Sequence, residues 1–413
     1  MKTNITLSNG HVLQDSPSTV NVLVELTAPA APTVERAPID VIVVADRSGS
    51  MDGPKLESVR DAIASLIRQL APHDRLGVVT FDNAIDVVVE LGEHASADAT
   101  TKVRNIRSGG STNLSGGWLK ACEILTDRRR PEAIARIVVL TDGHANAGIV
   151  DPDSVATMTS GAARHGITTS VIGFGDDYDE KFIALMADAG QGNDYFCAGP
   201  DQALEVFAAE FAGLASVVAQ NISVVARATN EATAIRLLNQ QVTSGDAHNL
   251  QVAIGDAFGE ETRRCIFAFD VSSQSELGLK HIADITVRYA SVVGDPQLHE
   301  VTFPVEVTVT SDFALVGEDD PRVVEEVRKL HVEDLRLKSL EASREGDFHT
   351  SARLMSEVLF NLTELGASDA ELDEVREWTV ASGPMDAMAM KRMYSSSRTS
   401  SRGRRKRFDP DNA

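Results

Sequence analysis

The chain has 413 residues, of which 43% are hydrophobic and 24% are charged. This composition is typical of a globular protein, and the length is sufficient for two or three domains. The net charge of −22 argues against nucleic acid as the main partner, because a protein that binds phosphates needs a basic surface.

The cysteine content and the hydropathy pattern indicate a reducing compartment. Cys122, Cys197 and Cys265 are far apart in the sequence and form no C-x-x-C pair, which argues against a zinc site or a disulfide framework. The N-terminal residues lack the apolar segment of a signal peptide, and no apolar run reaches the roughly 18 residues of a membrane-spanning helix. We therefore expect a cytoplasmic protein without a membrane span.

Residues 1–35 alternate apolar and polar side chains, most clearly over residues 20–26. This period of two predicts strands with one face in water. A proline-containing connector follows over residues 29–38. Because one or two strands are not stable alone, we expect this segment to complete a β-sandwich with residues 217–312.

Ile39 to Ala45 is a nearly unbroken run of apolar residues, most of them β-branched. It predicts a strand that is covered on both faces, as in a parallel sheet. Asp46, Ser48 and Ser50 follow it on alternate positions, and ligands of open α/β sheets bind outside the carboxyl ends of strands. Three hard oxygen donors there predict part of a site for a cation such as Mg²⁺. The alternative is an ordinary strand-to-helix turn, which favours the same residue types.

From residue 39 to about residue 210, strand and helix patterns alternate, which predicts a parallel sheet with helices on both faces. A helical stripe over residues 55–70 follows the first strand, and a buried strand over 75–81 is followed by a hairpin partner within 84–91. The remaining predicted elements are helices near 97–107, 114–127, 151–165, 179–189 and 200–216, and strands near 134–141, 167–175 and 194–198.

Two further motifs add oxygen donors at strand and helix boundaries. Thr112 lies in the glycine-rich stretch 108–114, just before a helical pattern, and Asp142 follows a buried strand and precedes Gly143. Taken singly, Thr112 fits a loop at a helix start, and Asp142 fits an Asp-Gly turn.

The five candidate ligands are Asp46, Ser48, Ser50, Thr112 and Asp142. In order, residue type and spacing they resemble the metal-ion-dependent adhesion site of von Willebrand factor A (VWA) domains. The resemblance covers roughly residues 36–210, and we expect the domain to span residues 36–216. It implies a doubly wound, mostly parallel, Rossmann-like α/β sheet with one antiparallel edge strand. It also implies an intact site for Mg²⁺, with Mn²⁺ or Ca²⁺ as possible substitutes.

The resemblance further implies a role for each ligand type. The three hydroxyls would contact the ion, and Asp46 and Asp142 would hold it directly or through water. An Asp or Glu side chain of a partner protein would then fill the open coordination position. The flanking segments are those expected of a bacterial cytoplasmic member of this family.

Two neighbouring residues are candidates for partner contact. We interpret Arg47, which lies between two of the ligands, as a rim residue that favours an acidic partner. We interpret His144 as a surface-loop histidine that touches the partner. The alternative makes His144 a catalytic base beside a metal-activated water, in a hydrolase that uses Asp46 and Asp142. We favour the first interpretation and assign no catalytic residue.

The pattern changes after residue 216. Residues 217–312 contain regularly spaced strand patterns, which predict an antiparallel β-sandwich, and residues 318–382 predict a three-helix unit. Residues 383–413 are serine-rich and basic, and we expect a disordered tail. The alternatives for this tail are that it folds back on the acidic body or recruits an acidic partner.

The sequence therefore predicts a non-enzymatic adaptor or assembly factor, in which a VWA domain is inserted between two parts of a β-sandwich and followed by helices. Its expected partner is a protein with an acidic side chain, and family context adds an AAA+ ATPase system as a possible partner. Two alternatives stay open: a metal-dependent hydrolase, and a scaffold whose metal is purely structural.

Overall fold

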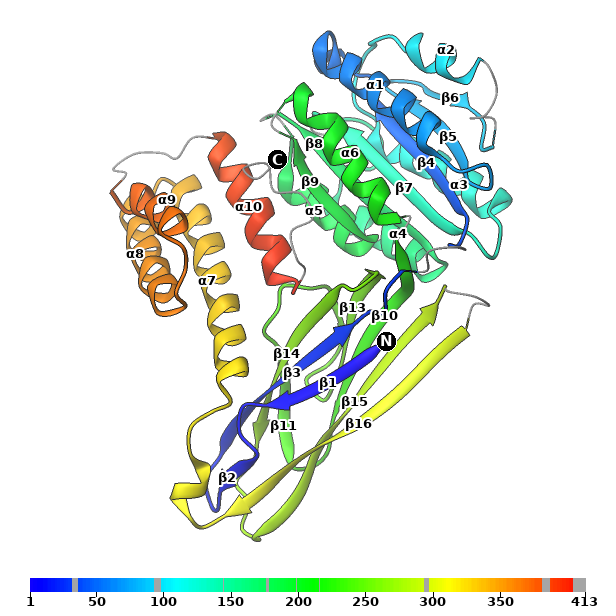
Figure 1. Ribbon diagram of the computed structural model, residues 1–413. Coiled ribbons are helices and arrows are strands. Elements are labelled where there is room, and N and C mark those ends of the chain that lie inside the picture. The colour runs from blue at the N-terminus through cyan, green and yellow to red at the C-terminus, as the bar shows by residue number, and fades with distance from the viewer. Residues whose placement is uncertain are drawn as a thin grey trace.

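The computed structural model describes residues 1–31, 36–92, 98–143, 145–175, 178–197, 199–214, 216–292, 297–380 and 387–403. Over these residues the chain forms two six-stranded sheets, one four-stranded sheet and a group of C-terminal helices (Figure 1). None of the helices in these ranges is both long enough and apolar enough to span a membrane.

The first six-stranded sheet belongs to the α/β domain and has the order β6-β5-β4-β7-β8-β9. Its pairs are parallel except β5–β6, which is the predicted antiparallel edge. The chain leaves β4 toward β5 on one side and returns to β7 on the other, so the switch point of the topology lies between β4 and β7. The strands are β4 (Ile39–Asp46), β5 (Arg75–Phe81), β6 (Ile85–Val89), β7 (Ile134–Thr141), β8 (Ile167–Phe174) and β9 (Gln191–Cys197).

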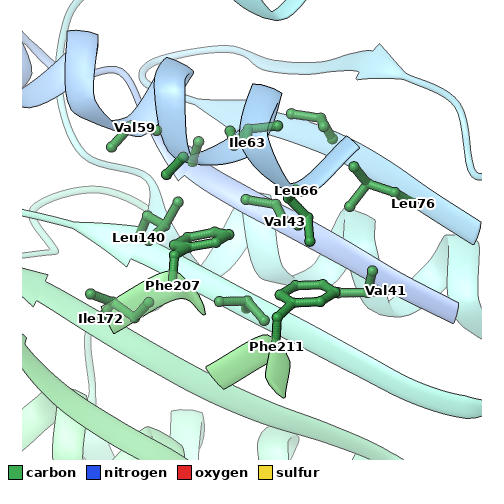
Figure 2. Close-up of a cluster of buried hydrophobic side chains, with 14 of the residues drawn as sticks. Val41, Val43, Val59, Ile63, Leu66, Leu76, Leu140, Ile172, Phe207 and Phe211 are labelled. Carbon is green, nitrogen blue, oxygen red and sulfur yellow. The ribbon is translucent and has the colours of Figure 1, made fainter. Parts of the chain in front are cut away.

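Helices cover both faces of this sheet, so successive residues of β4 enter different cores. Val41 and Val43 pack in the cluster that includes α1 (Pro54–Gln69) and α6 (Pro200–Leu214), as Figure 2 shows. Ile42 and Val44 pack in the opposite cluster. Each apolar side chain buried in this way contributes about 1.5–3 kcal/mol. The helix α2 (Ala99–Arg104) belongs to the first cluster, and the second is covered by α3 (Leu114–Arg128), α4 (Pro152–Arg164) and α5 (Glu180–Ala189).

The other two sheets form the predicted sandwich, with orders β1-β3-β14-β11 and β12-β13-β10-β15-β16-β2. Their inner side chains share one core. The N-terminal strands are β1 (Lys2–Leu7), β2 (His11–Leu13) and β3 (Ser18–Thr27). After the α/β domain come β10 (Val217–Ala228), β11 (Ala232–Leu237), β12 (Thr243–Gly245), β13 (Asn249–Phe258), β14 (Thr262–Val271), β15 (Gly278–Ser291) and β16 (Gln297–Thr310).

The strands from the two ends of this β-domain interleave, so the predicted insertion of the α/β domain is confirmed. The strand β3 pairs with β14 along its whole length, and β2 pairs with β16. The second pairing is parallel, so the prediction of a wholly antiparallel sandwich is wrong at this short edge.

Three helices follow: α7 (Pro321–Arg344), α8 (Phe348–Glu364) and α9 (Asp369–Val380). The first two begin at capping aspartates, Asp320 and Asp347. Gly346 and Gly366 then supply left-handed conformations, with φ of 82° and 71°, where the first two helices end. The three helices share a small core of their own.

The prediction of a disordered tail from residue 383 is wrong for α10 (Ala387–Ser401). This helix packs against α7 and against the α/β domain (Figure 1). Lys391 donates to Glu180 at 3.0 Å, Arg398 pairs with Asp188, and Arg402 pairs with Asp194 at 3.1 Å. These charge pairs with distant acidic residues, together with the packing of Met393 against the core of the C-terminal helices, hold this serine-rich and basic segment as a helix. The parts of the predicted tail at 383–386 and 404–413 lie outside the described residues.

A buried ionic cluster joins the α/β domain to the sandwich. Arg136 on β7 is only 1% exposed, and it donates to Asp256 on β13 at 2.7 Å and to Glu210 on α6 at 3.4 Å. Burial raises the pKa of Asp256 in spite of this guanidinium. Burial also acts on Glu210, but Arg136 and hydrogen bonds from Ser170, Asn193 and Tyr195 outweigh it and lower its pKa.

Replacing Arg136 with alanine should lower the free energy of unfolding by about 3–5 kcal/mol, because Glu210 would stay buried without its cation and Asp256 would keep only the charge of Arg263. Urea denaturation measures this loss. The matched control is Arg128→Ala, since Arg128 forms an exposed pair with Glu90 at 2.8 Å, and it should cost less than about 1 kcal/mol. Equal losses in the two variants would contradict a structural role for the buried cluster.

Candidate metal centre

The site begins at Asp46, the last residue of β4, whose side chain is fully buried. One carboxylate oxygen, Oδ1, accepts a hydrogen bond from the backbone N–H of Ser48 at 2.7 Å, and Oδ2 accepts one from Thr141 Oγ1 at 2.7 Å. Since Ala45 lies opposite Leu140 in the parallel pairing, the ends of β4 and β7 meet at one edge. Asp142, which follows β7, therefore lies beside Asp46.

The hydroxyls of the turn after β4 point to the same place. Ser48 Oγ and Ser50 Oγ are 3.1 Å apart, and Ser50 Oγ donates to Asp142 Oδ1 at 2.7 Å. A Cβ atom built on Gly143 would lie 3.6 Å from Thr112 Oγ1 and 3.7 Å from Ser50 Oγ. All five residues predicted as ligands are therefore brought together at the switch point of the sheet.

The loop that carries Thr112 is fixed by two side chains that the sequence analysis did not identify. Asp82 Oδ2 accepts a hydrogen bond from Gly110 N at 3.3 Å, and Asn83 fills the space beside the loop. A Cβ on Gly109 would lie 1.8 Å from Asp82 Oδ2, and one on Gly110 would lie 2.3 Å from Asn83 Oδ1. A side chain at either position would displace Asp82 or Asn83. The turn after β5 therefore determines where Thr112 lies.

Asn146 holds the other side of the Thr112 backbone. Its Oδ1 accepts a hydrogen bond from Thr112 N at 2.8 Å, and its own N–H donates to Thr112 O at 3.2 Å. Sequence analysis did not identify this role of Asn146. The polar residues after Asp142 indicate a loop, but no sequence pattern connects that loop with Thr112.

The two partner-contact candidates have different outcomes. Arg47 forms ion pairs with Asp82 at 3.1 Å and Asp86 at 2.5 Å, so two carboxylates of its own chain already balance the charge that the sequence analysis assigned to a partner. His144 lies outside the described residues.

The buried surroundings of Asp46 oppose its ionisation beside a second carboxylate. Burial raises the pKa of Asp46 to about 6, and the nearby charge of Asp142 acts in the same direction. Hydrogen bonds from Thr141 and Ser48 act against this shift. Asp142 also contacts Lys55 of α1, whose Nζ lies 2.5 Å from Asp142 Oδ2. The sequence analysis used Lys55 only as part of a helix.

The donor set fits a hard cation. It consists of two carboxylates and three hydroxyls, all oxygen ligands, which suit Mg²⁺ better than softer metals. The described residues contain no group of three or more His, Cys, Asp or Glu side chains that could hold a metal, and in this set the hydroxyls supply the remaining oxygen donors. Cys197 is fully buried, and burial raises the pKa of its thiol to about 12.

This fold defines a class of protein domain. Residues 40–208 match the model of the von Willebrand factor type A domain, so the α/β part of the chain is a VWA domain, as the resemblance predicted.

Two solved structures share the whole architecture. The von Willebrand factor type A protein from Catenulispora acidiphila matches with a TM-score of 0.79 over 98% of this chain and 97% of its own, at 19% identity. The ArnB paralog VWA2 from Sulfolobus acidocaldarius matches with a TM-score of 0.67 over 97% of this chain and 98% of its own, at 17% identity. At these identities the likeness shows the fold alone.

Curated relatives share a part of their length with this chain. The E3 ubiquitin-protein ligase WAV3 of Arabidopsis thaliana is 29% identical over 72% of this chain and 39% of its own length. The protein sll0103 of Synechocystis is 30% identical over 44% of this chain and 43% of its own. The inter-alpha-trypsin inhibitor heavy chain H3 of Mesocricetus auratus is 29% identical over 43% and 21%. This chain thus spans less than half the length of each of these relatives.

The raised pKa of Asp46 predicts a pH-dependent stability in the absence of metal. An unfolded aspartate titrates near pH 4, roughly its pKa in model peptides, so between about pH 4 and pH 6 the folded chain binds more protons at Asp46 than the unfolded chain. The contribution of Asp46 to stability therefore falls as pH rises through this window. Relative to wild type, Asp46→Asn should gain stability over the same window and reach an advantage on the order of 2–3 kcal/mol above pH 6.

Urea denaturation in EDTA across this pH range measures the difference. Asp270→Asn is a control with the opposite sign, because the hydrogen bond from Arg236 lowers the pKa of Asp270. That variant should be less stable than wild type near neutral pH, and the difference should shrink in acid. A pH-independent difference for Asp46→Asn would contradict the burial of an unfavourable charge.

Proposed function

We propose that this chain is a metal-dependent protein–protein interaction module that acts as a cytoplasmic adaptor or assembly factor. Its VWA domain binds Mg²⁺, and through the ion it binds an Asp or Glu side chain of a partner protein. The observation that carries this proposal is the convergence of two carboxylates and three hydroxyls at the switch point of the sheet. Mn²⁺ or Ca²⁺ would be substitutes for Mg²⁺.

The chemistry of the donor set favours an added anionic ligand. Ser48, Ser50 and Thr112 would hold the ion through neutral oxygens, while Asp46 and Asp142 would supply the negative charge directly or through water. The two carboxylates balance the formal charge of a divalent ion, but where they act through water their charge lies outside its first coordination sphere, and the ion would still attract an anion at its open position. A carboxylate of the partner would be the strongest available addition to such a site. This selectivity needs hydroxyls in three positions, because carboxylates there would close the site with the chain's own charge.

The relatives support an interaction module more than an enzyme. WAV3 is named as a ubiquitin ligase and the heavy chain as part of an inhibitor, so the shared region accompanies different activities. A common binding role for the VWA domain fits this diversity. We infer that the chain itself is not an enzyme. We also propose that His144 and Arg47 lie beside the partner, although Asp82 and Asp86 already balance the charge of Arg47. An AAA+ ATPase system stays a possible partner.

Calorimetric titration of Mg²⁺ into metal-free protein tests the site directly. Wild type should show saturable binding, and Ser48→Ala/Ser50→Ala should lose it, because two of the three hydroxyl ligands are removed. The control is Ser58→Ala/Ser65→Ala, which removes two hydroxyls from the adjoining helix α1, where Ser58 bonds Pro54 O and Ser65 accepts from Gln69. Equal binding in all three proteins would contradict the site.

Affinity capture tests the partner class. We expect a protein partner to be retained by the wild type in Mg²⁺, released by EDTA, and absent with Asp142→Ala. Substituting single Asp and Glu residues of the retained partner should identify one whose loss equals the effect of EDTA. Retention that is independent of Mg²⁺ would support a scaffold with a structural metal, and turnover of a captured molecule would support the hydrolase.

A further inference from the structure

Lys55 contacts the site without belonging to its predicted ligands. Its Nζ lies 2.5 Å from Asp142 Oδ2, and the side chain of Asp142 is fully buried while that of Lys55 is 30% exposed. Asp142 Oδ1 already accepts the hydroxyl of Ser50 at 2.7 Å. Both oxygens of Asp142 are therefore engaged by donors of the chain itself.

The backbone places Lys55 at this position. The strand β4 and the turn that carries Ser48 and Ser50 lead directly into α1, in which Pro54 is the first residue and Lys55 the second. Gly175, at the end of β8, lies beside the lysine, since a Cβ built on it would be 3.9 Å from Lys55 Nζ. The ammonium is thus held between the end of β8 and Asp142.

The neighbouring charges give this contact its importance. The carboxylates of Asp46 and Asp142 are both buried. Arg47 follows Asp46 directly but forms its ion pairs with Asp82 and Asp86. Among the ion pairs of the described residues, the one with Lys55 is the only pair that either site carboxylate forms. A cation of the chain therefore already compensates the charge that a metal ion would compensate.

We propose that Lys55 competes with the metal for Asp142 and so determines the Mg²⁺ affinity of this site. The inference rests on the proposed metal site and concerns the affinity of that site for Mg²⁺. A carboxylate oxygen that accepts a hydrogen bond from an ammonium at 2.5 Å has less negative charge to offer to a metal ion. The ammonium also repels a second cation that approaches the same carboxylate. Mg²⁺ binding therefore moves Lys55 away from Asp142, toward solvent.

The test is calorimetric titration of Mg²⁺ into metal-free full-length chain. Lys55→Met should bind Mg²⁺ about tenfold more tightly than wild type, because a like charge in contact with a ligand is removed. Lys55→Arg should bind no more tightly than wild type, since it retains the charge. The matched control Lys120→Met removes a lysine of α3 that pairs with exposed Glu123 at 3.0 Å, and its affinity should equal that of wild type.

Thermal unfolding gives a second readout that needs no partner protein. In EDTA, Lys55→Met should melt below wild type, because buried Asp142 loses its cation. Saturating Mg²⁺ should raise its melting temperature more than that of wild type, and both variants of Lys55 have to show native circular dichroism.

The outcomes separate the two proposals. Equal Mg²⁺ affinity in wild type and Lys55→Met, with binding lost in Ser48→Ala/Ser50→Ala, would overturn the competition and leave the metal site in place. Absence of saturable binding in wild type together with binding in Lys55→Met would support the competition. Absence of binding in both folded proteins would overturn both proposals.

Discussion

The buried guanidinium of Arg136 is the contact on which the arrangement of this molecule depends. It comes from a central strand of the VWA domain and reaches Asp256 of the sandwich and Glu210 of the last VWA helix. Burying three charged groups is unfavourable unless each is paired in a specific geometry, so the cluster tolerates few relative positions of the two domains. It lies near the beginning of β7, whereas Asp142 follows the end of that strand. The sandwich therefore contacts the sheet near the N-terminal ends of its strands, and the candidate metal centre lies at their C-terminal ends.

The sequence predicted what depends on short-range patterns. The apolar run of β4 and its position before Asp46 follow from period and strand length, and the VWA resemblance connected Asp46 with Thr112 and Asp142 across nearly a hundred residues. The same patterns did not identify the contacts that Lys55, Asp82 and Asn146 make at the site. Their contacts depend on how loops from different strands meet at the sheet edge, and no periodicity records that.

Two failures of the sequence analysis have a common physical cause. Arg136 is a single charge inside an apolar run, and its partners lie 74 and 120 residues away in sequence. The helix α10 was predicted to be disordered because its second half is rich in serine and basic residues. In both cases the stabilising partner is an acidic residue distant in sequence. Charge complementarity of this kind becomes visible only once the fold has placed the two segments side by side.

The insertion of the VWA domain into the sandwich has a mechanical consequence. The strand that leads into the domain, β3, is hydrogen-bonded on both sides, by β1 and β14, and the strand that leaves it, β10, is likewise flanked by β13 and β15. These two strands belong to different sheets. A force on the α/β domain is therefore divided between two interior strands, and because each strand has neighbours on both sides, neither can be detached one hydrogen bond at a time. The connection between the two domains therefore resists tension because the hydrogen bonds of β3 and of β10 are loaded together, in shear.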